Sequence, residues 1–352
     1  LVHPRDVTDV YRKYPFASFL PVWLLLFLLR MYWPVILSEI EGLVSSDTGE
    51  SIRGWVITIP LTAHQMLENR ALAQKKILQA AQLARAMGAR IIGLGALTSS
   101  ITGGGLMLVD QVDIGVTTGH AYTAHTVVSN LFALAERLEL DKEKVLIAIV
   151  GATGSVGQTS ALLLARAGYT HLLLIDLERK HHHFSPLIEN LKSLRKDISI
   201  TVSHQVRDVR DADFVITVTN APEAVVEADD LRPGAIVIDD AQPSDVAGDV
   251  LSREDVLAIE GGGVHTPGIN SHFNFGLKDK YDNYCCLAEV LLLASQKWDG
   301  HYVIHRAALE QVDRILPYAE QLGFRIADFQ NRRERISDEK IRRIHELLSN
   351  QS

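Results

Sequence analysis

Short apolar runs alternate with polar or helical stretches through the middle of the chain. Six such runs of four to six residues occur, at 145–150, 172–175, 198–202, 214–219, 235–238 and 256–259. A short, mainly apolar run is typical of a strand that is buried on both faces of a sheet. The regular alternation with helical patterns predicts an α/β fold with a parallel, doubly wound sheet.

Two further patterns precede this region. Residues 36–44 and 54–59 have strand character, and Ser46–Gly49 between them supplies turn residues, which predicts a hairpin. Residues 62–87 show a long helical pattern that ends before Gly88. We expect one helix over this whole range.

A glycine-rich passage follows a buried strand that is expected at 90–94. It comprises Gly93–Ser99 and Gly103–Gly105, and it has too few bulky side chains to form a packed element. Such a loop lets the backbone approach a ligand closely, and a flexible turn is the alternative interpretation. An amphipathic helix expected at 122–138 then leads into the alternating strands.

Helical patterns return at 284–295 and 309–322, and the charged tail from Asn331 is expected to be an exposed helix. With 352 residues, the chain is long enough for two or three domains. We expect three segments, which are an N-terminal α/β substrate domain at 1–140, a central Rossmann domain at 141–265 and a C-terminal helical segment at 266–352.

The most apolar stretch of the chain is 16–37. Pro21, Arg30 and Pro34 interrupt it, so it lacks the roughly 20 uninterrupted apolar residues that a membrane-spanning helix needs. The favoured interpretation is a helix that is buried or covered by a partner. The alternatives are a peripheral contact with a membrane surface or a greasy substrate and, least favoured, a true span.

Composition narrows the class of protein. The chain is 47% hydrophobic and 22% charged, as in globular proteins, and its net charge of −8 gives no reason to expect a nucleic-acid partner. Its two cysteines are neighbours, Cys285 and Cys286, and adjacent residues cannot form an ordinary disulfide. A reducing, cytoplasmic setting is therefore expected.

The strongest chemical signal is the loop Gly151-Ala152-Thr153-Gly154-Ser155-Val156-Gly157, which lies between an apolar strand and a helix. Gly151 suits a tight turn, Gly154 lets the backbone reach a pyrophosphate, and Gly157 allows close helix packing. The helix N-terminus supplies N–H groups to the phosphates. The strand, loop, helix and strand together predict dinucleotide binding.

The choice between NAD(H) and NADP(H) is open at this stage. Asp176 ends the second strand, where a carboxylate commonly binds the ribose hydroxyls of NAD and repels a 2′-phosphate. Arg179 and Lys180 follow directly and could hold the phosphate of NADP instead. His181–His183 read as part of the same loop, and no metal is expected there because partner ligands are not recognisable.

Cys286 opens an apolar helix, and a thiol at a helix N-terminus can become a reactive thiolate. Unpaired cysteines are also commonly buried as inert small hydrophobes, and no base is adjacent in the sequence. The residues alone leave both interpretations open.

At this point the chain resembles a known family, the long-chain acyl-[acyl-carrier-protein] reductases of cyanobacteria. The resemblance covers about residues 2 to 330. The motifs that show it are Gly95-Ala96-Leu97-Thr98-Ser99, Thr117-Thr118-Gly119, Val150–Gly157, Val237–Pro243, Gly262-Gly263 and Cys286-Leu287-Ala288-Glu289. It implies that Cys286 accepts an acyl group as a thioester and that NADPH then releases a fatty aldehyde. The family pattern has a different residue at His120, so proton-transfer details do not carry over.

The resemblance implies acyl-carrier protein or acyl-coenzyme A as the thioester substrate. Tyr122, His120 and His265 are candidates for the acid by residue type and by their proximity in the sequence to the motif loops. A basic cluster could dock the acidic carrier, but acidic residues are interleaved with it, so a solvated helix is the favoured interpretation. The basic residues are Arg332, Arg333, Arg335, Lys340, Arg342 and Arg343.

Two other functions remain possible. Residues 239–243 also resemble shikimate-type and amino-acid dehydrogenases, which reduce a carbonyl directly, and there Cys286 would only pack. The chain could also be a non-catalytic dinucleotide-binding or membrane-associated interaction protein.

Overall fold

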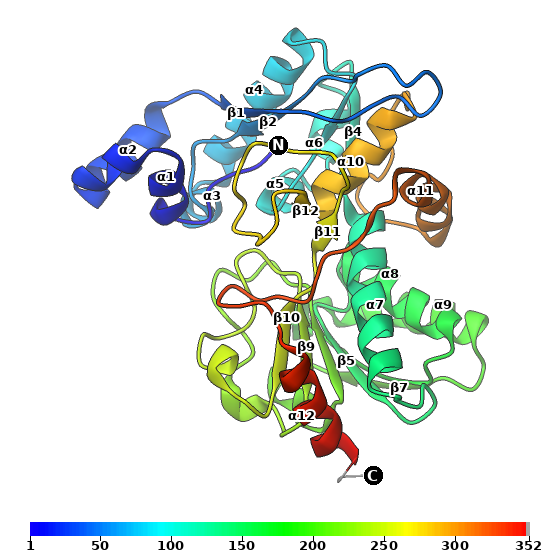
Figure 1. Ribbon diagram of the computed structural model, residues 1–352. Coiled ribbons are helices and arrows are strands. Elements are labelled where there is room, and N and C mark those ends of the chain that lie inside the picture. Colours follow the sequence, from blue (N-terminus) through cyan, green and yellow to red (C-terminus); the bar gives the residue numbers. More distant parts are fainter. Residues whose placement is uncertain (350–352) are drawn as a thin grey trace. The chain divides into compact units, whose positions relative to one another are not determined.

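The computed structural model describes residues 1–349, which form two compact units (Figure 1). The first unit consists of Leu1–His120, His265–Arg306 and Asp313–Arg325. The second unit consists of Ala121–Val264, Ala307–Val312 and the described residues from Ile326 onward. Each unit therefore combines segments that are distant in the sequence.

A six-stranded parallel sheet forms the centre of the second unit. Its strands are β5 (Leu146–Val150), β6 (His171–Ile175), β7 (Ser199–Ser203), β8 (Phe214–Thr217), β9 (Ile236–Asp239) and β10 (Leu257–Glu260). They pair in the order β10-β9-β8-β5-β6-β7, which is the Rossmann order with its reversal between β5 and β8. All six strands predicted from apolar runs are confirmed, as is the doubly wound α/β class.

Strand β5 shows why these runs are apolar throughout. Ile147 and Ile149 point to one face of the sheet, Ala148 and Val150 point to the other, and all four are buried. Helices therefore cover both faces. The helices of this part of the chain are α7 (His120–Arg137), α8 (Ser155–Ala167), α9 (Phe184–Leu194) and α12 (Asp338–Ser349), with short 3₁₀ turns η2 (Glu178–His183), η3 (Val206–Asp211), η4 (Ala228–Asp230) and η5 (Val250–Ser252).

The first unit contains two small sheets. Strands β1 (Val35–Ile40) and β2 (Gly54–Thr58) form the predicted antiparallel hairpin, and β3 (Ile91–Gly93) pairs in parallel with β4 (Gly115–Thr117). The other elements are α1 (Val7–Lys13), η1 (Pro15–Phe19), α2 (Val22–Met31), α3 (Ala63–Glu68), α4 (Arg70–Ala86), α5 (Leu97–Ile101), α6 (Leu106–Val109), β12 (Asp282–Tyr284) and α10 (Cys285–Ser295). The chain passes from one unit to the other within α7, β11 (Gly263–His265), α11 (Leu309–Leu322) and β13 (Arg325–Ile326), and also between Arg306 and Ala307.

The single long helix expected at 62–87 is wrong, because the chain breaks it at Asn69. This residue has φ −131° and ψ 78°, outside the helical region, and its side chain accepts a hydrogen bond from the Leu72 N–H at 3.0 Å. An asparagine that caps the following turn competes with a continuous helix. The predicted start is correct, since Thr62 and Gln65 form a reciprocal capping box.

The glycine-rich passage is only partly a loop. Residues Leu97–Ile101 form the short helix α5, and both of its terminal side chains are buried, contrary to the expectation that nothing there would pack. Gly103, Gly104 and Gly105 do form a turn, with φ between +65° and +86°. Two bulky side chains four residues apart were enough to fold the helix against the core.

The C-terminal tail forms a helix, but the expectation of an exposed one is wrong for one of its faces. Ile341, Ile344 and Leu348 recur at helical spacing on α12 and are buried. The many charged residues between them made the whole segment look polar in the sequence.

The apolar stretch at 16–37 is largely exposed within the chain. Trp23 is 70% exposed and Phe27 is 56% exposed, so the chain itself does not bury this helix, and cover by a partner stays a prediction. In residues 1–349, no helix is long and apolar enough to cross a membrane.

Candidate functional site

The loop between β5 and α8 requires glycine for identifiable reasons. Gly151 has φ +88°, and a Cβ added to it would lie 2.9 Å from the Val218 carbonyl oxygen. A Cβ on Gly157 would lie 2.4 Å from the Gly151 carbonyl oxygen. Gly154 precedes the first turn of α8, where a Cβ would meet only the Gly151 oxygen, at 3.2 Å. The loop is therefore a closely folded backbone turn that leads directly into a helix N-terminus.

This loop lies at the reversal of strand order. It follows β5, and Gly151 packs against Val218 and Thr219, which follow the adjacent strand β8. In doubly wound sheets, the crevice at this point binds ligands, and the helix N-terminus favours anions. The arrangement fits the pyrophosphate of a dinucleotide.

Asp176 is held inside this loop rather than pointing freely into solvent. Its Oδ2 accepts hydrogen bonds from the Thr153 N–H, at 3.1 Å, and from the Thr153 hydroxyl, while Lys180 Nζ lies 3.1 Å from Oδ1. The Leu177 N–H also donates to Oδ1, at 2.8 Å. Burial alone would raise the pKa of this carboxyl, but the hydrogen bond from Thr153 and the charge of Lys180 lower it below its usual value. The carboxylate thus ties the loop to the end of β6.

Other predicted residues of this loop have clear positions. The Ser155 hydroxyl accepts a hydrogen bond from the Ala307 N–H at 2.9 Å, and Val156 lies in the first turn of α8. Arg179 is exposed on η2, directly after the Asp176 corner. His181 pairs with His204 through ring nitrogens 3.0 Å apart.

A pair of buried carboxyl groups at the same edge of the sheet was missed from the sequence. Asp239 ends β9 and accepts from Thr217 at 2.8 Å, while Asp245 accepts from the Thr219 N–H at 2.8 Å. Burial, and then the neighbouring charge of Asp239, raise the pKa of Asp245 to about 7. Burial likewise raises the pKa of Asp239. An aspartate a few residues after a buried strand was the available signal, but only the fold brings Asp245 next to Thr219.

Cys286 lies in the first unit, in the first turn of α10, and is half-buried, whereas Cys285 is buried. Two glycines enclose it. A Cβ added to Gly95 would lie 3.4 Å from Cys286 Sγ, and a Cβ added to Gly119 would lie 2.6 Å from both Cα and Cβ of Cys286. Gly95 follows β3 and Gly119 follows β4, so the carboxyl ends of this parallel pair face the start of α10.

Glu289, one turn further along α10, binds the loop after β4 through hydrogen bonds. It is fully buried, and its Oε1 accepts hydrogen bonds from the Gly119 N–H, at 3.1 Å, and from the Thr117 hydroxyl. The Thr117 oxygen in turn accepts from the Val303 N–H at 3.2 Å. Three of the motifs singled out in the sequence therefore meet at one place.

The loop beside Cys286 carries backbone strain. Ala96, directly after Gly95, has φ +50°, a value that residues with a Cβ rarely adopt. It precedes α5, whose Ser99 lies with its Oγ 3.1 Å from His120 Nε2. Among the described residues, His120 Nδ1 is buried without a hydrogen-bond partner. Burial, and then the nearby His305, lower the pKa of His120 to about 4, so its imidazole is neutral at neutral pH.

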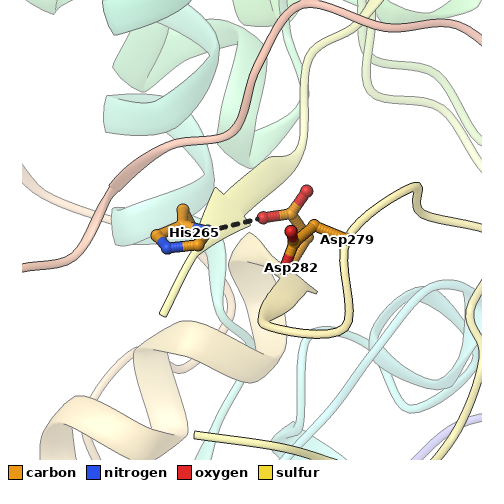
Figure 2. A group of neighbouring side chains, drawn as sticks. All are labelled: His265, Asp279 and Asp282. Atoms are coloured by element: carbon orange, nitrogen blue, oxygen red, sulfur yellow. Dashed lines mark hydrogen bonds and ion pairs between the residues drawn. The ribbon is translucent and has the colours of Figure 1, made fainter. Parts of the chain in front are cut away.

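The other two candidate acids have different surroundings. Tyr122 is buried in α7 of the second unit, with its ring 5.6 Å from that of His125. His265 Nδ1 lies 2.9 Å from Asp282 Oδ1, which accepts the hydrogen bond, and Asp279 lies beside this pair (Figure 2). Their potential metal-ligand atoms lie within 4.8 Å of one another. Asp279 accepts a separate hydrogen bond from the Tyr281 N–H at 2.8 Å.

The basic cluster of the tail is largely engaged within the second unit. Arg333 donates to the Gly248 carbonyl at 2.8 Å, Lys340 donates to the Arg253 carbonyl at 3.2 Å, and Arg343 lies 3.7 Å from Glu254. These contacts hold the tail against its own unit.

Comparison with known proteins gives distant relatives, and no family model matches the chain. The aminotransferase PigE of a Serratia species is 27% identical over 306 residues, which are 85% of this chain but 35% of that protein. The chain thus spans about a third of the length of PigE. The long-chain acyl-[acyl-carrier-protein] reductase of Synechococcus elongatus is 25% identical over 308 residues, which are 83% of this chain and 87% of that protein.

Solved structures are similar at a low level. The NAD-dependent malic enzyme of Thermotoga maritima has a TM-score of 0.39 at 14% identity, covering 81% of this chain and 78% of that one. Quinate dehydrogenase from Corynebacterium glutamicum, in complex with NAD, has a TM-score of 0.30 at 15% identity, covering 64% and 62%.

Proposed function

We propose that the protein is a nicotinamide-dependent reductase that takes an acyl group from a thioester onto Cys286 and releases it as an aldehyde. The observation that carries this proposal is the enclosure of Cys286 by Gly95 and Gly119 at the start of α10. Because glycine has no side chain, the backbone at both positions can approach Cys286 closely. The distant similarity to an acyl-[acyl-carrier-protein] reductase over most of both chains supports the same assignment.

The thiol is well placed to act as a nucleophile. A sulfur atom in the first turn of a helix faces its positive end, which favours the thiolate. Glu289 holds the Gly119 loop against this turn through the Gly119 N–H. The strained backbone at Ala96 is the kind of distortion that functional sites retain.

The first step is an exchange of thioesters. The Cys286 thiolate attacks the carbonyl carbon of the acyl thioester, a new carbon–sulfur bond forms, and the thiol of the carrier leaves with the electron pair of the old one. Acyl-carrier protein and acyl-coenzyme A have the same phosphopantetheine thiol, so both are proposed as donors.

The glycine loop Gly151–Gly157 would hold the dinucleotide, with its pyrophosphate at the N-terminus of α8. A bound NAD(P)H would supply the hydride that reduces the acyl group to the aldehyde level. Breaking of the carbon–sulfur bond then returns the electron pair to Cys286. The Asp176 carboxylate would repel a 2′-phosphate, but the positive charge of Lys180 offsets its negative charge. We therefore propose NADP(H) as the cofactor, with NAD(H) as the alternative.

Aldehyde formation leaves negative charge on the carbonyl oxygen before the carbon–sulfur bond breaks, and a neutral proton donor can stabilise it. His120 is our choice among the three candidates because its neighbour Gly119 packs against Cys286. Its imidazole is neutral, it is hydrogen-bonded to Ser99, and its second ring nitrogen has no partner among the described residues.

Mass spectrometry of the intact protein tests the covalent step. After incubation with palmitoyl-coenzyme A and no reduced cofactor, one acyl adduct is expected, and peptide mapping should place it on Cys286. Cys286→Ala should abolish both the adduct and the oxidation of NADPH by the thioester. Cys285→Ala is the matched control, because this buried neighbour should be dispensable for both.

Aldehyde formation by the Cys286→Ala variant would sink the proposed intermediate. It would favour direct carbonyl reduction.

A further inference from the structure

An unusually apolar surface covers the N-terminal elements of the first unit. Of fourteen large apolar side chains that are exposed in the described part of the chain, ten fall between residues 14 and 36. We call them the N-terminal apolar surface, whose members are Tyr14, Phe16, Phe19, Val22, Trp23, Phe27, Met31, Tyr32, Trp33 and Ile36. Single exposed apolar residues are normal, but a concentration of this kind marks an interaction site.

Helix α2 is apolar on both of its faces. One face packs inward, since Leu25 is buried and the Leu26 carbonyl accepts a hydrogen bond from Gln65 Nε2 at 2.9 Å. Trp23 and Phe27, four residues apart, occupy the outer face and are more than half exposed. A surface helix in water normally has a polar outer face, so this helix is built for a second apolar environment.

Strongly exposed apolar residues also lie on either side of α2. Phe19, at the end of η1, is 88% exposed, and Trp33, beyond α2, is 68% exposed. Lys76 donates to the Tyr32 carbonyl, and an ion pair joins Arg30 to Glu68, so the segment is anchored to α3 and α4. The apolar side chains are therefore held outward by ordered structure.

The charge of this segment is opposite to that of the chain. Residues 10–38 contain no aspartate or glutamate and three basic residues, Arg12, Lys13 and Arg30, whereas the whole chain has a net charge of −8. Arg12 pairs with Asp9 and Arg30 pairs with Glu68, while Lys13 is exposed. A surface that combines apolar side chains with local positive charge is complementary to an anionic lipid bilayer.

Helix length limits the depth of such a contact. Helix α2 has ten residues, about 15 Å at 1.5 Å per residue, which is half of a hydrocarbon core of about 30 Å. The surface also contains Trp23, Trp33, Tyr14 and Tyr32, the residue types that prefer the boundary between headgroups and acyl chains. A shallow, interfacial contact fits both features.

We infer that the N-terminal apolar surface docks the protein onto anionic lipid bilayers, with η1 and α2 in the interface plane. Phe19, Trp23 and Phe27 enter the acyl-chain boundary, and Arg12 and Lys13 lie at the level of the lipid phosphates. This docking site does not depend on the proposed reaction, because it rests only on exposure, charge and helix length.

Vesicle flotation of the full chain tests the inference. The protein should float with vesicles of phosphatidylglycerol and phosphatidylcholine, and it should bind pure phosphatidylcholine several times more weakly, with the difference shrinking as NaCl is raised. The Phe19→Glu/Phe27→Glu variant should partition at least about tenfold more weakly, because it loses two phenylalanines that would be buried in the bilayer. Leu177→Glu/Leu194→Glu, at exposed leucines of the second unit, is the matched control and should float like the parent protein.

Quenching of tryptophan fluorescence by brominated lipids gives a second measurement. It should be strong in the parent protein and largely lost in Trp23→Phe/Trp33→Phe, which keeps Trp55 and Trp298 and should still float. Absence of flotation of the parent protein would overturn the inference. A second result would also overturn the inference. The parent protein would self-associate in sedimentation experiments without lipid, would not bind vesicles, and would lose the self-association on the Phe19→Glu/Phe27→Glu change.

Discussion

The α-carbon of Gly119 lies against Cys286 so closely that a methyl group placed on it would come within 2.6 Å of the cysteine Cβ. Gly119 also has φ +80°, which a residue with a side chain adopts only at a cost. Both the conformation and the contact therefore require glycine beside the candidate nucleophile.

Replacing Gly119 with Ala is expected to remove acylation of Cys286 and to lower the free energy of unfolding by about 2 kcal/mol or more, because it adds both backbone strain and overpacking. Adduct formation with palmitoyl-coenzyme A and thermal denaturation measure the two effects. Gly103→Ala separates them, since Gly103 has φ +65° with open space around its Cβ position. Equal loss of acylation in both variants would show that strain alone, and not the contact with Cys286, is responsible.

His120→Asn is expected to slow aldehyde release by about a hundredfold while the acyl-enzyme still forms, because the proposed proton donor is lost after the first step. Single-turnover experiments with acylated protein and NADPH measure the second step directly. His125→Asn removes another half-buried histidine of α7 whose pKa is lowered to about 4, so it controls for the effect on stability. A rate of release equal to that of the parent protein would exclude His120 as the donor.

Asp245→Asn tests the carboxyl pair at the ends of β8 and β9. The folded pKa of Asp245 is about 7, whereas aspartate in an unfolded chain has a pKa of about 4. Between these values the folded protein retains a proton that the unfolded chain loses, so its stability falls as the pH rises through this window and levels off above about 7.

The asparagine cannot ionise, so the variant should gain stability relative to the parent protein as the pH rises from 4.5 to 8. Thermal denaturation at several pH values measures this difference. Asp211→Asn, at an exposed position of the same unit, should show no such trend. A constant difference between the Asp245 variant and its parent across the range would contradict the raised pKa.

Arg179→Ala addresses cofactor choice. If the exposed guanidinium binds the 2′-phosphate, the dissociation constant for NADPH should rise about tenfold, while that for NADH should change less than twofold. Fluorescence titration with both cofactors gives the two constants. Lys192→Ala on α9 controls for a general loss of positive charge from the second unit. Equal constants for NADPH before and after the change would remove Arg179 from the site.

Apolar periodicity alone determined the central sheet, because a strand buried on both faces needs an uninterrupted run such as Ile147–Val150. Local chemistry likewise determined the hairpin, the Thr62 cap and the glycine loop. Where two local preferences compete, periodicity was a poor guide. Asn69 caps a turn inside an apparently continuous helix, and Leu97 and Ile101 fold a helix inside a glycine-rich passage.

The chemical surroundings of the candidate residues could only come from the tertiary structure. Asp176 looked like a ribose ligand by its position, but Thr153 and Lys180 occupy its carboxylate. Gly119 and Glu289 are 170 residues apart in the sequence and meet at one hydrogen bond, and no periodic pattern encodes such a contact. The sequence therefore determined which elements form, since that depends on neighbouring residues, while folding decided which side chains and charges meet.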